Sequence, residues 1–215
     1  GGTVTNCYNT GTVTATGSVA SIGGVCGCSI APISNCYNIG TVTATSSDAD
    51  ISGICGYCFG PIKNCYYLAD TEDENGGKTT AQFASGEIAY LLSQGCTIGE
   101  VTYDGTIWGQ TIGTDTYPTL GGAKVYKNAI YEGCVGNPGE PVSYEYSNTE
   151  KNTYGDHPDA DGDGRCDVSD CGAIIDGIGA KLTGYSLSLT GNIGVNFYME
   201  LSNDIVNDAS AYMNF

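Results

Sequence analysis

The sequence has few basic residues, a single histidine and no long apolar run. Only 7 Lys and Arg oppose 24 Asp and Glu among its 215 residues, which gives a formal net charge of −17 at pH 7. A surface this acidic repels phosphate backbones, so we expect no nucleic acid as a partner. No stretch of about 18 apolar residues occurs, so we expect no membrane insertion of this chain.

Signatures of common enzymes are missing as well. The sequence contains no HExxH, no GxSxG and no P-loop motif. Residues 1–69 carry only three charged side chains, those of Asp48, Asp50 and Lys63. Three such groups cannot build the carboxylate cluster that cleavage of a polysaccharide needs. The single histidine leaves a nucleophilic triad without a good base, so we expect no enzyme activity.

A repeat with a period of 29 residues dominates the N-terminal third. NCYNTGTVTAT at residues 6–16 returns as NCYNIGTVTAT at residues 35–45, and a third copy begins at Asn64. Each copy holds short alternations of apolar and polar residues, separated by Gly, Asn, Ser or Pro, which is typical of short strands. A fixed period of this length indicates stacked units, so residues 1–68 are predicted to be coils of a β-solenoid.

Stacked coils place like residues in columns. Neighbouring strands lie about 4.8 Å apart, so each residue should lie one strand spacing from its copy. Four columns are expected to point inward: Val4/Ile33/Ile62, Val13/Val42, Ile22/Ile51 and Val25/Ile54. The tyrosines of the repeats are expected to form an outward column, which is the candidate binding surface: Tyr8, Tyr37 and Tyr66.

The motifs NCYNxGTVT and GGVCG/SGICG resemble the GLUG-type repeats of surface proteins from Gram-positive bacteria (Firmicutes). The resemblance covers residues 1–68 and implies a right-handed β-helix displayed outside the cell. Some IgA-specific metallopeptidases carry such repeats, but the resemblance implies no peptidase activity here. The chain begins inside a repeat at Gly1 and ends in a strand-like pattern at Phe215, so we expect a piece of a longer exported protein.

Most of the 11 cysteines belong to the repeats. They are Cys7, Cys36 and Cys65 in one predicted column, Cys26 and Cys55 in another, and Cys28 and Cys58. The preferred interpretation is that they are small buried apolar residues, because free cysteine packs in this way. Disulfides between coils are the alternative, since one strand spacing lies within the allowed Cα range.

Residues 69–131 contain the one clear helix that the sequence predicts. An acidic loop comes first, and apolar residues then recur on one face from about Thr80 to Gln94. Thr79 or Thr80 can serve as the N-cap, and Gly95 is expected to end the helix.

This helix is expected to cap the solenoid, because an open end exposes unpaired backbone and core. Phe83, Leu91 and Leu92 should then be buried, and Trp108 should pack within the cap. Residues 82–120 resemble the segment that often follows GLUG repeats, which supports that role.

Residues 132–180 are a predicted linker that carries the one chemical motif. Residues 159–170 match the calcium-loop pattern DxDxDG with a closing acid, and Gly164 provides the sharp turn. An Asp at the last position resembles dockerin-type loops more than sensor EF-hands. The predicted calcium ligands are Asp159, Asp161, Asp163, the carbonyl of Arg165, Asp167 through water, and Asp170.

A zinc site is the alternative in the same stretch. Cys134, His157, Cys166 and Cys171 are four soft ligands, and His157 is the only histidine. The stretch HPDADGDGRCD…CG resembles small H…C…CG modules of Firmicutes surface proteins. Those usually end in C-x-x-C, whereas four residues separate Cys166 from Cys171 here. A third interpretation is an acidic turn without metal, with or without a Cys166–Cys171 disulfide.

The C-terminal tail, residues 181–215, alternates again. The alternation runs through Tyr185 to Leu189, stops at residues 190–192, and resumes over residues 193–201. This pattern predicts a β-hairpin. Because a lone hairpin is marginally stable in water, we expect it to start an incomplete β-domain.

The sequence therefore predicts a mainly β, non-catalytic module of an extracellular or cell-surface protein. It would act as a stalk or adhesion surface, with calcium stiffening the joint to the next domain. Its partner would be a host or cell-wall protein or glycan whose identity the sequence does not specify. The alternative is an accessory region of a large surface enzyme, a peptidase or glycosidase, whose catalytic domain lies outside this chain.

Overall fold

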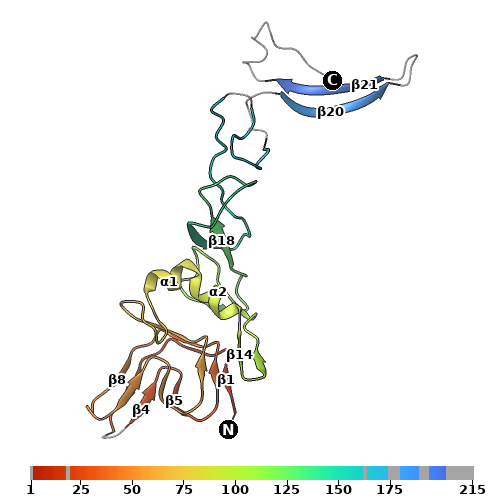
Figure 1. The fold of residues 1–215 in the computed structure, drawn as a ribbon. Helices are drawn as coiled ribbons and strands as arrows, with labels where there is room; N and C mark the ends of the chain where they lie inside the picture. The colour runs from red at the N-terminus through yellow and green to blue at the C-terminus, as the bar shows by residue number, and fades with distance from the viewer. Residues whose placement is uncertain (1, 18–19, 162–163, 174–179, 189–193, 202–215) are drawn as a thin grey trace. The chain divides into compact units, whose positions relative to one another are not determined.

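The computed structural model describes residues 2–17, 20–161, 164–173, 180–188 and 194–201. Within them the chain is mainly β, with short parallel sheets in its N-terminal part and antiparallel pairs further along (Figure 1). None of the helices found in these residues has the length and apolar character needed to cross a membrane.

The chain divides into two compact units. Unit 1 comprises Gly1–Asn128 and Tyr144–Lys151, and unit 2 comprises Ala129–Ser143 and Asn152–Phe215. The repeats and the helices belong to unit 1, and the predicted metal ligands all belong to unit 2.

Strands that are one repeat apart pair in parallel. The register places Val4 beside Ile33 and Ile33 beside Ile62, and it places Val13 beside Val42. The columns predicted from the 29-residue period are therefore present in the pairing.

The first sheet is β1 Val4–Thr5, β6 Ile33–Ser34 and β11 Ile62–Lys63, and the second is β2 Tyr8–Asn9, β7 Tyr37–Asn38, β12 Tyr66–Leu68 and β13 Gly77–Lys78. Three pairs follow: β3 Val13–Ala15 with β8 Val42–Ala44, β4 Ser21–Gly23 with β9 Asp50–Ser52, and β5 Cys26–Ser29 with β10 Cys55–Cys58.

Asparagines form the corner between the first two strands of each repeat. Asn6, Asn35 and Asn64 have left-handed backbone conformations, with φ of 52°, 52° and 53°. Asparagine is one of the few residues other than glycine that adopt this conformation readily. The side chains also stack, because Asn64 Nδ2 donates a hydrogen bond to Asn35 Oδ1 at 2.9 Å. The recurring Asn-Cys pair therefore marks the position where each repeat turns.

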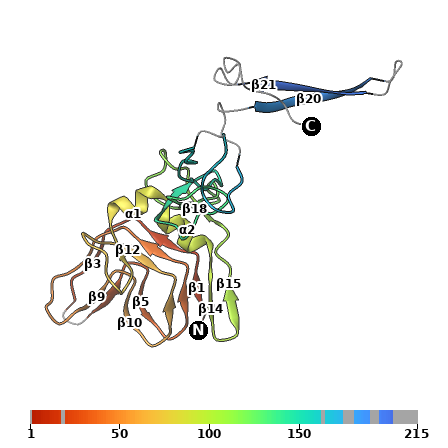
Figure 2. The same cartoon turned by 45° about the horizontal axis from the view of Figure 1, so that its top comes forward.

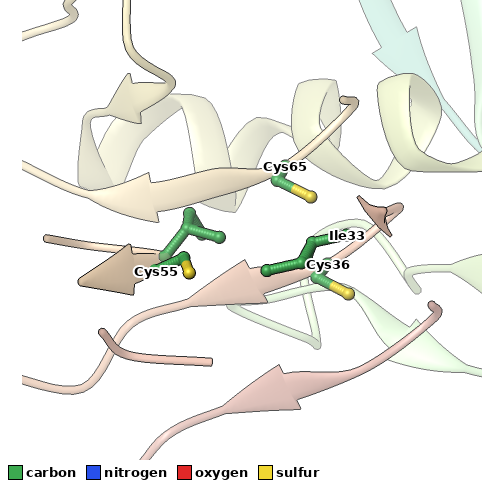
Figure 3. Packing of buried hydrophobic residues seen from close by; sticks show 5 residues of the cluster. Ile33, Cys36, Cys55 and Cys65 are labelled. Carbon is green, nitrogen blue, oxygen red and sulfur yellow. The ribbon is translucent and has the colours of Figure 1, made fainter. Parts of the chain in front are cut away.

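The core of the repeats combines aliphatic side chains with thiols. Ile33, Cys36, Ile54, Cys55 and Cys65 form one buried cluster. Figure 3 shows that the Cys36 and Cys65 side chains point the same way from neighbouring strands. All 11 cysteines are free thiols, and Cys7 and Cys28 are exposed. The interpretation as small buried residues therefore holds for Cys36, Cys55 and Cys65 and is wrong for the exposed Cys7 and Cys28.

Two residues that were expected to be buried are exposed. Ile22 and Ile33 are 5% and 0% exposed, whereas Ile51 and Ile62 are 51% and 41% exposed. Ile51 lies on β9 and Ile62 on β11, and each of these strands has one neighbouring strand in the described part of the chain. The prediction of inward columns is therefore wrong at Ile51 and Ile62, because no further strand covers them in the described part of the chain, whereas Ile54 is buried as predicted.

The single predicted helix is in fact two helices. They are α1 Thr80–Ser85 and α2 Glu87–Ser93, and Gly86 between them has φ of 91°. The left-handed conformation favours glycine here, and a Cβ atom at Gly86 would also displace the end of the Ile112 side chain, whose Cδ1 would lie 2.3 Å away. Thr79 is the N-cap and makes a capping box, as the sequence predicts.

The helices pack on the sheet that contains the repeat tyrosines, as Figure 2 shows. The buried cluster that joins them consists of Tyr37, Phe83, Ile88, Leu92 and Trp108. The predicted burial of Phe83 and Leu92 is confirmed, and Leu91 is partly buried.

The expected outward tyrosine column is wrong for Tyr37. This residue is 1% exposed, and its hydroxyl donates a hydrogen bond to the carbonyl oxygen of Pro118 at 2.7 Å. Tyr8 stacks on it and is 49% exposed, while Tyr66 is half-buried. The reason is that a non-repetitive segment covers this face, and the periodicity alone does not show which face a later segment will cover.

The remaining strands are antiparallel or short. They are β14 Cys96–Ile98, β15 Val101–Tyr103, β16 Trp108–Gly109, β17 Thr119–Leu120, β18 Tyr126–Ile130, β19 Ser143–Ser147, β20 Ala180–Ser188 and β21 Gly194–Leu201. The hairpin of β14 and β15 lies beside the asparagine corners, since Asn35 Nδ2 donates a hydrogen bond to the Tyr103 carbonyl at 3.1 Å. The predicted C-terminal hairpin is confirmed by the antiparallel pairing of β20 with β21, and its turn at residues 189–193 lies outside the described residues.

Candidate metal centre

Unit 2 brings together the four residues of the zinc alternative. One ligand atom from each of Cys134, His157, Cys166 and Cys171 lies within 4.8 Å of the other three. Cys134 is 0% exposed and Cys166 is 8% exposed, and the other two are half-buried. Residues that are up to 37 positions apart, from 134 to 171, thus meet at one partly enclosed site.

Two distances inside this group equal the edges of a tetrahedron around one zinc ion. Cys166 Sγ lies 3.7 Å from Cys134 Sγ, and Cys171 Sγ lies 3.4 Å from His157 Nδ1. Zinc bonds of about 2.3 Å to sulfur and about 2.0 Å to nitrogen imply edges of about 3.8 Å between two sulfurs and about 3.5 Å between sulfur and nitrogen. Three thiols and one imidazole are also the ligand types that structural zinc sites use.

Backbone hydrogen bonds hold the three cysteines in place. The Asn137 N–H donates to the Cys134 carbonyl at 3.1 Å, which closes a turn just after this ligand. The Cys166 N–H donates to the Ala173 carbonyl at 3.0 Å, and the Cys171 N–H donates to the Val168 carbonyl at 3.1 Å. The loop that carries Cys166 and Cys171 is therefore closed by its own backbone.

Gly136 allows the two halves of the site to meet. A Cβ atom at this position would lie 2.3 Å from the Cα of Cys171, so any larger residue would push the chains apart. Sequence reasoning did not identify Gly136, although Gly136-Asn137-Pro138 two residues after Cys134 is a turn signal.

The surroundings of Cys171 favour a thiolate. Hydrogen bonds from the Cys134 thiol and from the backbone N–H groups of Ala173 and Gly136 lower the pKa of Cys171 to about 6. Burial raises the pKa of Cys166 to about 11. A divalent cation at the centre would supply the positive charge that ionises the remaining thiols.

A second group of possible metal ligands consists of carboxylates. One oxygen from each of Asp159, Asp161 and Asp167 lies within 4.8 Å of the others. The Gly164 N–H donates to Asp159 Oδ2 at 3.1 Å, and Gly164 has φ of 77°, as the predicted turn requires. The Ala160 N–H donates to Asp167 Oδ2 at 2.5 Å, so this carboxylate also fixes the start of the loop.

Only part of the predicted calcium ligand set comes together. Asp163 lies outside the described residues. Asp170 does not belong to the carboxylate group, although the sequence suggests it as the closing ligand, and it adopts a left-handed conformation with φ of 65°. The predicted Arg165 ligand is its backbone carbonyl, which stays a prediction. Among the described residues three carboxylates come together for a cation, against a full set of four ligands at the cysteine and histidine group.

Comparisons with protein-family models, with curated proteins and with solved structures give no match for this chain. The two ligand groups and the stacked repeats are therefore the features from which a function can be inferred.

Proposed function

We propose that this chain is a non-catalytic module of an extracellular or cell-surface protein, in which unit 2 is a small fold held together by zinc. The observation that carries the proposal is the group of Cys134, His157, Cys166 and Cys171 with its tetrahedral spacings. Four protein ligands leave no open position on zinc, and closed sites of this kind stabilise folds instead of activating water.

The small number of other buried side chains in unit 2 supports this role for the metal. Among the residues of unit 2 whose side chains are described, the buried apolar ones are Ala129, Cys134 and Cys166. Two of these three belong to the metal centre. The described part of unit 2 thus contributes little apolar burial of its own, and binding of a structural zinc ion is worth about 10–16 kcal/mol in small zinc domains.

For unit 1 we propose coils of a right-handed β-solenoid, of the GLUG type that the repeats resemble. The in-register parallel pairs one repeat apart support it. The helices would act as a partial cap, because Asn64 Nδ2 donates to the carbonyl oxygens of Leu91 at 3.1 Å and Leu92 at 3.3 Å. The carbonyl groups at the end of α2 thereby accept from the last asparagine of the stacked corner, and the Tyr66 hydroxyl donates to Asn64 Oδ1 at 2.9 Å, where a further asparagine would donate.

We propose calcium as a second ion, at Asp159, Asp161 and Asp167. Carboxylate oxygens suit a hard cation, and the turn at Gly164 has the conformation that a calcium loop needs. The module would then present unit 1 to a host or cell-wall protein or glycan, with unit 2 as a metal-stiffened joint.

The direct test is the metal content of the purified full chain. Zinc titration against a chromophoric chelator should give one tight site, whose affinity Cys134→Ser and Cys166→Ser should each lower at least tenfold. Cys28→Ser is the matched control, because Cys28 is an exposed thiol of unit 1. Calcium titration should show a weaker site that is lost in the double variant Asp159→Asn with Asp167→Asn, with zinc binding retained. A zinc-free chain whose unit 2 resists proteolysis as well as the loaded chain would refute the zinc proposal.

A further inference from the structure

The second repeat of unit 1 has three strands with one unpaired edge each. Within the described residues, β8 pairs with β3 alone, β9 with β4 alone and β10 with β5 alone. Of the third repeat, only β11 and β12 pair with strands of the second repeat, namely β6 and β7. The backbone N–H and C=O groups of an unpaired edge can pair with a further strand.

A groove of about 1080 Å³ lies at this edge. Its lining includes Val42, Ile51 and Ile54 from the second repeat and Ile62 and Tyr67 from the third. Ile51 and Ile62 are about half exposed, although both have the residue type of the buried column below them. The mixed polar and apolar lining therefore contains two exposed isoleucines of the kind that the next level of a stacked fold would cover.

We propose that this groove binds an extended basic peptide segment, which adds as a parallel strand beside β8 and β9. The pairing of the second repeat on the first supplies the geometry. Val42 lies beside Val13 and Ile51 beside Ile22, so an incoming strand would place β-branched side chains over Val42 and Ile51. The inference rests on the solenoid part of the proposed function and is independent of the metal centre.

Charge determines the chemistry of the occupant. Asp70 and Glu74 line the groove, and the exposed Asp50 lies on β9. Lys63 is the one basic residue of the lining, and its Nζ donates a hydrogen bond to the Thr97 carbonyl at 3.0 Å. A second copy of this chain would bring another net charge of −17 to an acidic rim, so Lys or Arg on the incoming segment is favoured.

The test uses the zinc-loaded full chain and a synthetic fluorescent peptide that copies residues 41–54 with Asp48→Lys and Asp50→Lys. This peptide has the strand pattern of the second repeat. In the register of the repeats, one of its two lysines would lie beside Asp50 of the protein. Fluorescence anisotropy should show saturable binding. The peptide with its original aspartates should bind at least tenfold more weakly, and a peptide N-methylated at alternate residues should not bind, because it cannot pair with a strand edge.

Variants of the protein test whether the peptide binds in this groove. Ile51→Asp and Ile62→Asp should each weaken binding at least tenfold, and both residues are exposed enough for the variants to fold. Val101→Asp is the control, since Val101 is 54% exposed on β15 and does not line the groove.

Absence of binding, or binding that Ile51→Asp leaves unchanged, would overturn the proposal. Concentration-dependent self-association that Ile51→Asp removes would assign the edge to a second copy and would overturn it as well. Zinc binding should persist in every variant, so a failure here is distinguishable from a failure of the metal centre.

Discussion

The indole N–H of Trp108 donates a hydrogen bond to the carbonyl oxygen of Asn35 at 3.0 Å. Asn35 is the buried corner of the second repeat, and Trp108 is 2% exposed and lies outside the repeats. The same N–H lies 3.1 Å from Asn6 Oδ1, in the corner of the first repeat. One side chain therefore ties two stacked repeats to the segment that follows them.

Replacement of Trp108 by Phe should destabilise unit 1 by about 1–3 kcal/mol, because the Asn35 carbonyl loses a buried donor while much of the aromatic packing stays. Trp108→Ala should cost about 3–5 kcal/mol, because it also opens a cavity. Urea unfolding followed by circular dichroism measures both values. Tyr57→Phe, at a half-exposed ring, should change stability by less than about 0.5 kcal/mol. A Trp108→Phe variant as stable as that control would show that the hydrogen bond does not matter.

Replacement of Gly86 by Ala should be more costly than the same change at Gly113. The two glycines have similar positive φ values, 91° and 85°, so the conformational cost of about 1 kcal/mol is shared. A Cβ at Gly86 would meet Ile112 Cδ1 at 2.3 Å, whereas at Gly113 it would meet nothing within 4 Å. Because the Ile112 side chain can turn away, we expect an excess loss of up to about 1 kcal/mol for Gly86→Ala in urea unfolding. Equal losses would mean that the break between α1 and α2 can absorb a side chain.

Unit 1 should lose stability at high pH through Tyr66. Burial raises the pKa of Tyr66 to about 12 from its ordinary value of 10.0. A raised folded-state pKa contributes stability that is fully present below the unfolded pKa and is lost as pH rises towards the folded value. The free energy of unfolding should therefore fall between about pH 10 and 12, by up to about 1.4 kcal/mol per pH unit from this group.

The variant Tyr66→Phe should show a shallower fall in that range, measured as urea midpoints at several pH values. Tyr185→Phe is the control, since Tyr185 is 75% exposed. Identical slopes for wild type and Tyr66→Phe would show that Tyr66 ionises equally easily in the folded and unfolded chains.

The pairing of the repeats could be predicted, because identical residues at a fixed period indicate which residues of neighbouring strands lie side by side. Val13 and Val42 are the same residue in the same local sequence, and they lie side by side. The corners could have been predicted as well, since Asn is suited to the left-handed conformation at Asn35 and Asn64.

The sequence could not show what covers the repeats. Tyr37 is buried because Trp108 and Pro118 lie on it, and no repeat relates these residues to the tyrosine column. The break at Gly86 was missed because a glycine inside an apolar helical pattern reads as a tolerated interruption until its contact with Ile112 is known.

For the candidate site, the sequence predicted both ligand groups and placed calcium ahead of zinc. A different order required distances between residues that are far apart in the chain, such as Cys134 and Cys166, which only the fold supplies. The spacing between Cys166 and Cys171 argued against zinc, yet the backbone turn around Cys171 brings both sulfurs to the same site.

The most direct test of the proposed zinc centre is X-ray absorption spectroscopy at the zinc edge of the zinc-loaded full chain. We expect a first shell of three sulfurs at about 2.3 Å and one nitrogen at about 2.0 Å, from Cys134, Cys166, Cys171 and His157. Cys171→Ser should replace one sulfur by an oxygen or nitrogen scatterer. A first shell of oxygens alone, unchanged by that substitution, would place the ion elsewhere and contradict the proposed metal centre.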